Sequence, residues 1–259
     1  MNADYHTHST YSDGSFIWSM CRAAEEVGLD AVGIADHCNV SADDRQSNRK
    51  KAMGFNLDLT YERRREGIET VRENFDLRVF DAVEMDYEPD DEDVVREFLD
   101  EAGFDYAIGS VHVLDGVNVH VESYFARKPV EERRELVDRY FEKLVALAES
   151  ELFEVAAHPD LLERNPAFRG LATGAHYRRA AEAFADSRTV PELNAGRVLS
   201  AYGELHPNGA FLDTLLDHGV GVTTGTDSHD PEEVGPRVER IEAELAERGI
   251  EPIAVVDGV

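Results

Sequence analysis

The chain alternates short apolar runs with longer amphipathic stretches along its whole length. Each apolar run is rich in Val, Ile, Ala or Phe and has the length of a buried parallel strand. The stretches between them repeat apolar residues at three- and four-residue steps, which is the spacing of an amphipathic helix, as in Val130 to Ser150. The seven predicted strands are Ala3 to His6, Leu29 to Asp36, Arg78 to Tyr87, Tyr106 to Leu114, Phe153 to His158, Val190 to Ala195 and Val220 to Asp227.

Strands that alternate with helices indicate an α/β fold with a parallel sheet. Seven such units in roughly 230 residues favour a TIM-like β/α barrel, with a doubly wound open sheet as the alternative. No linker or repeat interrupts the pattern, so we expect a single domain over residues 1–259. The least regular segment, Asn39 to Asn56, is polar and directly follows the second strand. We expect a mobile loop there, which is a candidate lid.

The charge balance excludes one large class of partner. The chain has 26 Lys and Arg against 54 Asp and Glu, so its formal net charge is 26 − 54 = −28. A protein that binds duplex nucleic acid needs a basic surface, so we expect no stable nucleic-acid partner. Only four basic residues are lysines, and an acid-rich, lysine-poor surface suits a salt-rich cytosol, in which ions screen self-repulsion. Hydrophobic residues, at 42%, suffice for a buried core.

The cysteines and the N-terminus predict where the protein works. Two cysteines, Cys21 and Cys38, do not form a disulfide framework, and the first residues lack the basic-then-apolar order of a signal peptide. No apolar run approaches the roughly 18 residues of a membrane span. We therefore expect a cytoplasmic protein without membrane contact.

Candidate chemistry lies at the carboxyl ends of the predicted strands. Six of the ten histidines fall there: His6, His8, His37, His112, His158 and His229. Three carboxylates join them, namely Asp13, Glu84 and Asp227. In a parallel barrel the carboxyl ends converge on one face, so we expect these nine side chains to lie together.

The spacing of these residues favours a metal site. His6 and His8 are two residues apart in an extended segment, so both imidazoles point to the same side, and Asp227 and His229 repeat this spacing. Imidazoles and carboxylates suit Zn, Mn or Fe. A single histidine at a strand end is usually a packing residue, but six together with three acids favour more than one metal ion.

The other polar residues of these segments have simpler interpretations. We predict that Asp4 and Asp36 orient metal-binding imidazoles, and that Cys38 is a small buried residue rather than a ligand. The four remaining histidines lie elsewhere, and we expect His176 and His218, on helical stretches, to face solvent or cap helices. The remaining two are His120 and His206.

Several segments, in order along the chain, resemble the PHP (polymerase and histidinol phosphatase) family. They are DYHTHSTYSDGS (4–15), GIADHCN (33–39), VEMDY (83–87), IGSVHVLDG (108–116), AHPDLLER (157–164), ELNAGRV (192–198) and GTDSHDPEEVG (225–235). GSVHVLDG, ELNAGR and the following ELHPN are most similar to the histidinol-phosphatase branch. Ala82 and Ala157 stand where glycine is common in the family, and Asp13 stands where some relatives have His.

The resemblance implies a distorted seven-stranded β/α barrel with two to three divalent metals. His6, His8, Glu84 and Asp227 would hold the first metal, and Glu84 would bridge to a second, completed by His112 and His158. Asp13, His37 and His229 would hold the third. The implied nucleophile is a metal-bridging hydroxide held by Glu84, with Asp227 and His229. Two metals activate such a water and clamp phosphoryl oxygens, so the pocket would be positive despite the acidic surface.

The implied activity is hydrolysis of a small phosphate monoester such as histidinol phosphate, in histidine biosynthesis. Arg164 and Arg197 follow the fifth and sixth strands and are candidate phosphate ligands, with surface salt bridges as the alternative. We expect the segment after Asp36 and the segment Val198 to His206 to line the part of the pocket that binds the alcohol portion of the substrate. The alternative functions are a nucleotide phosphatase or short-range exonuclease, and a noncatalytic metal-binding module.

Overall fold

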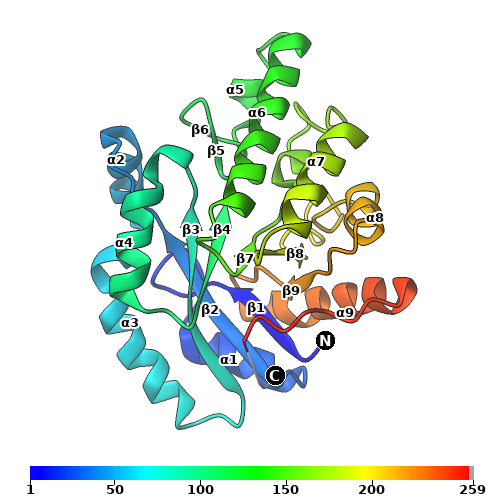
Figure 1. The fold of residues 1–259 in the computed structure, drawn as a ribbon. Coiled ribbons are helices and arrows are strands. Elements are labelled where there is room, and N and C mark those ends of the chain that lie inside the picture. The colour runs from blue at the N-terminus through cyan, green and yellow to red at the C-terminus, as the bar shows by residue number, and fades with distance from the viewer. Residues whose placement is uncertain (257–259) are drawn as a thin grey trace.

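Seven parallel strands form the centre of the molecule (Figure 1). The computed structural model describes residues 1–256, without the side chains of Asp44 and Ser47. Neighbouring strands in the sheet follow the order of the chain. They are β1 (Ala3–Thr7), β2 (Ala31–Cys38), β3 (Arg78–Asp86), β4 (Tyr106–Ser110), β7 (Val155–Ala156), β8 (Val190–Asn194) and β9 (Thr223–Gly225).

The first and last strands approach each other, so the sheet is a nearly closed barrel. Thr7 forms a parallel bridge with Ser228. The His8 amide donates to the Ser228 carbonyl at 2.9 Å, and the Asp227 amide donates to the His6 carbonyl at 2.7 Å. The predicted α/β barrel is therefore confirmed, and the open doubly wound sheet is wrong.

Helices surround the sheet, as Figure 1 shows. The predicted face of α6 is buried from Leu136 to Ala148, as its apolar spacing requires. The helices are α1 (Ile17–Glu26), α2 (Asp44–Met53), α3 (Leu57–Arg72), α4 (Glu92–Ala102), α5 (Glu122–Phe125), α6 (Val130–Glu149), α7 (Gly174–Ala185), α8 (Gly209–Asp217) and α9 (Pro231–Arg248), with short 3₁₀ turns η1 (Pro89–Asp91) and η2 (Leu161–Arg164). None of the described helices combines the length and apolar composition needed to cross a bilayer.

Several strands are shorter than the sequence predicts. β4 ends at Ser110, so His112 lies beyond the strand rather than within it. The reason is a small hairpin of β5 (Val113–Leu114) and β6 (Val117–Asn118), in which the His112 carbonyl accepts from the Val119 amide at 2.8 Å. The backbone of this segment thus bonds to the hairpin instead of the barrel.

The expectation of a loop over Asn39 to Asn56 is wrong for its central part, because α2 forms there. The Asp43 side chain accepts from the Arg45 amide at the start of α2, and Gly54, with φ of 80°, ends it. Lys50 of α2 donates to the Asn39 carbonyl and to Asp58 of α3, each at 2.6 Å. Caps and an ion pair stabilise a helix whose polar sequence carries no apolar stripe.

Candidate metal centre

All nine predicted ligands come together at the carboxyl ends of the strands, with Glu84 of β3 in the middle. One carboxylate oxygen, Glu84 Oε1, lies 3.0 Å from His158 Nε2 and 3.5 Å from His112 Nε2. The Ser110 hydroxyl donates to the same oxygen at 2.5 Å. Histidines that follow β4 and β7 therefore meet on one side of this carboxylate.

The other oxygen, Glu84 Oε2, faces a second set of imidazoles. It lies 2.6 Å from His37 Nδ1, 3.5 Å from His6 Nε2 and 3.7 Å from His8 Nε2. His37 and Glu84 are direct partners in the register of β2 and β3, which explains their closeness. Although burial alone would raise it, the imidazoles of His37, His6 and His112 hold the pKa of the Glu84 carboxyl well below its usual range.

His6 and His8 point their ring nitrogens at the same place. Their Nε2 atoms are 3.1 Å apart, and both rings are fully buried. His6 Nδ1 lies 2.9 Å from Glu192, to which it donates, so in the neutral ring His6 Nε2 carries a lone pair. Asp227 Oδ1 lies 3.2 Å from His8 Nε2. Lone pairs and a carboxylate oxygen that face one point match the donor set of a divalent metal.

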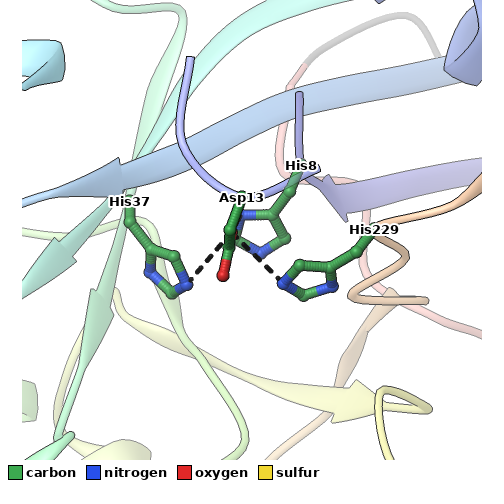
Figure 2. Close-up of side chains that lie close together, drawn as sticks. All are labelled: His8, Asp13, His37 and His229. Atoms are coloured by element: carbon green, nitrogen blue, oxygen red, sulfur yellow. Dashed lines mark ion pairs between the residues drawn. The ribbon is translucent and has the colours of Figure 1, made fainter. Parts of the chain in front are cut away.

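A further group surrounds Asp13, in the loop after β1 (Figure 2). Asp13 Oδ1 lies 3.4 Å from His229 Nε2 and 3.8 Å from both His37 Nε2 and His8 Nδ1. Figure 2 shows the carboxylate between the rings of His37 and His229, with His8 beside it. Although partial burial would raise it, the hydrogen bond to His229 and the charges of His37 and His8 lower the pKa of Asp13.

Three sets of side chains are compact enough to hold a metal ion. In each set the donor atoms lie within 4.8 Å of one another, and the sets are His6, His8 and Asp227; His37, Glu84 and His112; and His8, Asp13, His37 and His229. The grouping differs from the predicted one: His8 and His37 each belong to two sets, Glu84 is not grouped with His6 and His8, and His158 belongs to none of the three. Glu84 Oε2 is buried among imidazole nitrogens, the nearest being His37 Nδ1, yet no described residue donates to it with hydrogen-bond geometry, so the residues present fit a metal that would bind it.

Two of the four described non-glycine residues with positive φ angles lie in this cluster. His158 and Asp227 have positive φ angles of 29° and 52°, although neither is a glycine. Gly196 makes room for Asp227, since a Cβ at Gly196 would lie 2.2 Å from Asp227 Oδ2. Such conformations cost free energy and concentrate at functional sites.

Two carboxylates that support the imidazoles of proposed ligands were not identified from the sequence. Glu192 of β8 bonds His6 Nδ1, and Asp86 Oδ1 lies 2.6 Å from His112 Nδ1. Such carboxylates fix the tautomer and orientation of a metal-binding histidine. Asp86 is two residues after Glu84 on the same strand face, a spacing that could have identified it. Glu192 lies inside a strand and has no such signal.

Asp4 and Asp36 have a different role from the predicted one. Asp4 accepts from the Thr226 hydroxyl at 2.5 Å and from the His6 and Thr226 amides. Asp36 accepts from the amide and hydroxyl of Ser9 and from the Ser12 hydroxyl, each at 2.7 Å. Both carboxylates therefore hold the backbone and hydroxyls of ligand-bearing segments, and in the described part of the chain neither bonds an imidazole. Cys38 is buried in the core, as predicted.

A cavity of about 130 Å³ opens beside the nine residues. The segment 39–56 lines it through Asn39, Gln46, Arg49, Lys50, Met53 and Phe55. Among the described residues, none of 198–206 lines the cavity, so the expectation for that segment is wrong. The chain there turns back instead, since the Asn194 and His206 backbones bond each other.

The two predicted phosphate ligands take different places. Arg197 lines the cavity, and its buried Nε has no hydrogen-bond partner among the described residues. Arg164 does not line the cavity but donates to His120 Nε2, at 3.2 Å, and His120 does line it. Neither arginine forms an ion pair with a described carboxylate, contrary to the salt-bridge alternative.

The remaining histidines are structural or separate from the cluster. His176 takes part in the capping box of α7, and His218 donates from Nδ1 to the Thr214 carbonyl at the end of α8, so both predictions are confirmed. His206 is fully buried, with Nδ1 2.6 Å from Asp160.

The fold and the cluster together define a barrel protein with a candidate multinuclear metal site, and the comparisons with known proteins agree. The model of the PHP domain family matches residues 4–196. The chain therefore belongs to the PHP domain family.

Individual relatives of this chain carry histidinol-phosphatase names. A curated protein of Deinococcus radiodurans, named "Probable histidinol-phosphatase", is 26% identical over 175 residues, which are 66% of this chain and 65% of the relative. This chain thus aligns with slightly less than two thirds of that protein's length.

Solved structures share the whole barrel. Histidinol phosphate phosphatase of Lactococcus lactis, complexed with zinc, L-histidinol and phosphate, is 19% identical with a TM-score of 0.76, and the match covers 98% of this chain and 95% of that one. A candidate histidinol phosphatase of Listeria monocytogenes is 20% identical with a TM-score of 0.75, over 90% and 97%. At these identities the likeness establishes the fold.

Proposed function

We propose that the protein is a metal-dependent phosphoesterase, and specifically a phosphomonoesterase of small phosphate monoesters. The observation that carries this proposal is Glu84, whose two buried oxygens face imidazoles on opposite sides at 2.6–3.7 Å. A carboxylate so placed is suited to bridge two metal ions. The other proposed ligands are His6, His8, Asp13, His37, His112, His158, Asp227 and His229.

Two or three divalent ions, Zn, Mn or Fe, would activate water and neutralise phosphoryl charge when bound. The chain's own residues supply the rest. Glu192 and Asp86 orient His6 and His112. Arg197 lines the cavity, has a buried Nε without a partner among the described residues, and carries a guanidinium suited to bind a phosphoryl oxygen. Most of the cluster is buried, and the lower hydration of its buried members strengthens these interactions.

Histidinol phosphate is the first substrate to test, because the family relatives carry that activity in their names. The cavity admits a small ester, and the acidic surface disfavours a long polyanion such as nucleic acid. Nucleoside phosphates and short oligonucleotides are the alternatives to compare with it.

The test is phosphate release by the full chain loaded with Zn or Mn, measured on histidinol phosphate, an aryl phosphate, nucleoside mono- and bisphosphates and short oligonucleotides. We expect release from a monoester, loss of that release in Glu84→Gln, and full activity in the exposed control Glu204→Gln. Metal binding without turnover of any substrate would support the noncatalytic alternative and contradict the proposal.

A further inference from the structure

His120, which sequence analysis assigned to no site, is held in one tautomer by Arg164. It lies between β6 and α5 and lines the cavity. The Arg164 guanidinium has only N–H donors, and its Nη1 is 3.2 Å from His120 Nε2, so Nε2 must be the acceptor. A protonated ring would place N–H against N–H. The contact therefore requires a neutral imidazole that carries its proton on Nδ1.

This Nδ1–H is an unmet donor. His120 Nδ1 is buried and has no hydrogen-bond partner among the described residues, and the same holds for Arg197 Nε on the same cavity. A buried donor without a partner costs free energy comparable to a lost hydrogen bond, so a native structure rarely keeps one without a use. Both donors belong to residues that line one cavity, an arrangement that suits an acceptor entering it.

The donor lies beside the proposed metal ligands. The ring centroid of His120 is 6.3 Å from that of His112. Burial and the charge of Arg164, with further contributions from His112, Arg197 and His158, lower the pKa of the His120 imidazole, which agrees with a ring that stays neutral.

We infer that His120 binds the substrate, donating from Nδ1 to an oxygen of the phosphoryl group, and that Arg197 donates from the same wall. Arg164 is then a positioning residue that acts through His120 rather than a phosphate ligand itself. This inference rests on the proposed function for the identity of the anion, a phosphate ester or its product, inorganic phosphate. The tautomer itself follows from the Arg164 contact alone.

The tautomer is tested without turnover by ¹⁵N NMR of the metal-loaded full chain with labelled histidine, with the His120 signals assigned from His120→Asn. We expect the wild-type ring in the Nδ1–H form, a mixture of tautomers in Arg164→Met, and a shift of the Nδ1–H signal when inorganic phosphate is added. A wild-type ring in the Nε2–H form, or a signal unmoved by saturating phosphate, overturns the inference.

The binding role is tested by kinetics and by inhibition with inorganic phosphate. His120→Phe should lower kcat/KM for the best monoester about 10- to 100-fold and raise the phosphate inhibition constant, as expected for loss of one hydrogen bond to a charged group. His120→Asn, whose amide can place a donor near the Nδ1 position, should retain most activity. The control His218→Asn, at the C-terminal cap of helix α8, should match wild type.

A double-mutant cycle separates the roles of the two residues. If Arg164 acts through His120, Arg164→Met added to His120→Phe causes no further loss of kcat/KM, whereas additive losses contradict the positioning role. If wild type turns over monoesters and both His120 variants match it, the inference about His120 is wrong while the proposed function stands. If wild type hydrolyses no monoester, phosphate binding measured by calorimetry decides: weaker binding in His120→Phe keeps the anion site, and equal or absent binding overturns it.

Discussion

The carboxylate of Glu192 lies 2.9 Å from Nδ1 of His6, and both side chains are buried. In the neutral ring, the contact places the proton of His6 on Nδ1 and turns Nε2 towards His8 and Glu84. Gly225 is part of the same arrangement, because a Cβ there would lie 1.7 Å from Glu192 Oε1. A residue in the middle of β8 thus sets the direction of a proposed metal ligand on β1.

We predict that Glu192→Gln weakens metal binding about 10- to 100-fold, the usual cost of losing a carboxylate that supports a metal-binding histidine. The amide has nearly the same shape but loses the charge that makes His6 a stronger ligand. Affinity is measured by competition with a coloured chelator, and Glu204→Gln on the surface is the matched control. Unchanged affinity in Glu192→Gln would show that His6 binds no metal.

Metal uptake should release protons at neutral pH. Although burial alone would lower it, Glu84 and Asp13 raise the pKa of His37 to about 9, so this ring is protonated in the metal-free protein at pH 7. A metal binds only the neutral imidazole, and binding must therefore displace the proton. The release should diminish as the pH rises through about 9.

Calorimetric titration of the metal-free protein in two buffers with different ionisation heats measures this release. We expect different apparent heats at pH 7, corresponding to at least one proton per chain, and convergence of the heats above pH 10. Equal heats at pH 7 would contradict the role of His37.

The buried pair of Asp36 and Arg64 should make a large contribution to stability. Arg64 is fully buried and donates to Asp36 at 2.9 Å and to Asp81 at 2.6 Å. Asp36→Asn leaves the guanidinium incompletely paired and loosens Ser9 and Ser12, so we expect the free energy of unfolding to fall by about 3 kcal/mol. The change is measured by urea unfolding at pH 7, with the exposed Asp30→Asn as control.

The contribution of this pair to the free energy of unfolding depends on pH through the Asp36 carboxyl. Burial raises the pKa of Asp36, but the charge of Arg64 and the hydrogen bonds of Ser9 and Ser12 outweigh it and lower the pKa below the ordinary 3.8. The stabilisation by the ionised Asp36 is therefore fully present above pH 3.8, the pKa of the unfolded state. It is lost as the pH falls through the lower pKa of the folded state. If Asp36→Asn and Asp30→Asn unfold at the same urea concentration, the pair is not stabilising.

Salt should stabilise the protein, because the surplus carboxylates behind its net charge of −28 repel one another. Ions at molar concentration shorten the screening length to a few ångströms and remove most of this repulsion. We predict that the unfolding temperature rises by several degrees between 0.1 M and 2 M KCl in a thermal scan. An unfolding temperature that is constant or falls would contradict adaptation to a salt-rich cytosol.

The barrel and the nine clustered residues could be predicted because both follow from local rules. Strand-like apolar runs such as Arg78 to Tyr87 are recognised from composition, and parallel strands bring their carboxyl ends to one face. The partners of these residues could not be predicted in the same way. Glu192 reaches His6 across 186 residues of sequence, a contact that only the closed barrel defines.

Helix α2 and the role of His120 were harder to predict, because polar contacts rather than a hydrophobic pattern determine them. The helix α2 depends on the Asp43 cap and on the contact of Lys50 with Asp58, neither of which leaves a hydrophobic pattern. His120 lies after a two-residue strand, and its importance comes from Arg164, 44 residues further along the chain. Polar contacts, local at α2 and long-range at His120, thus account for most of what the sequence left open.

The central claim is that the cluster around Glu84 binds divalent metals and uses them to hydrolyse a phosphate monoester. It is tested most directly by following phosphate release from the best monoester before chelation, after complete metal removal, and after Zn or Mn is restored, with the metal content determined at each stage. We predict two to three ions per chain, loss of release on their removal, and recovery on their return. Release that survives complete metal removal, or a protein that holds its metals yet hydrolyses no monoester, would contradict the claim.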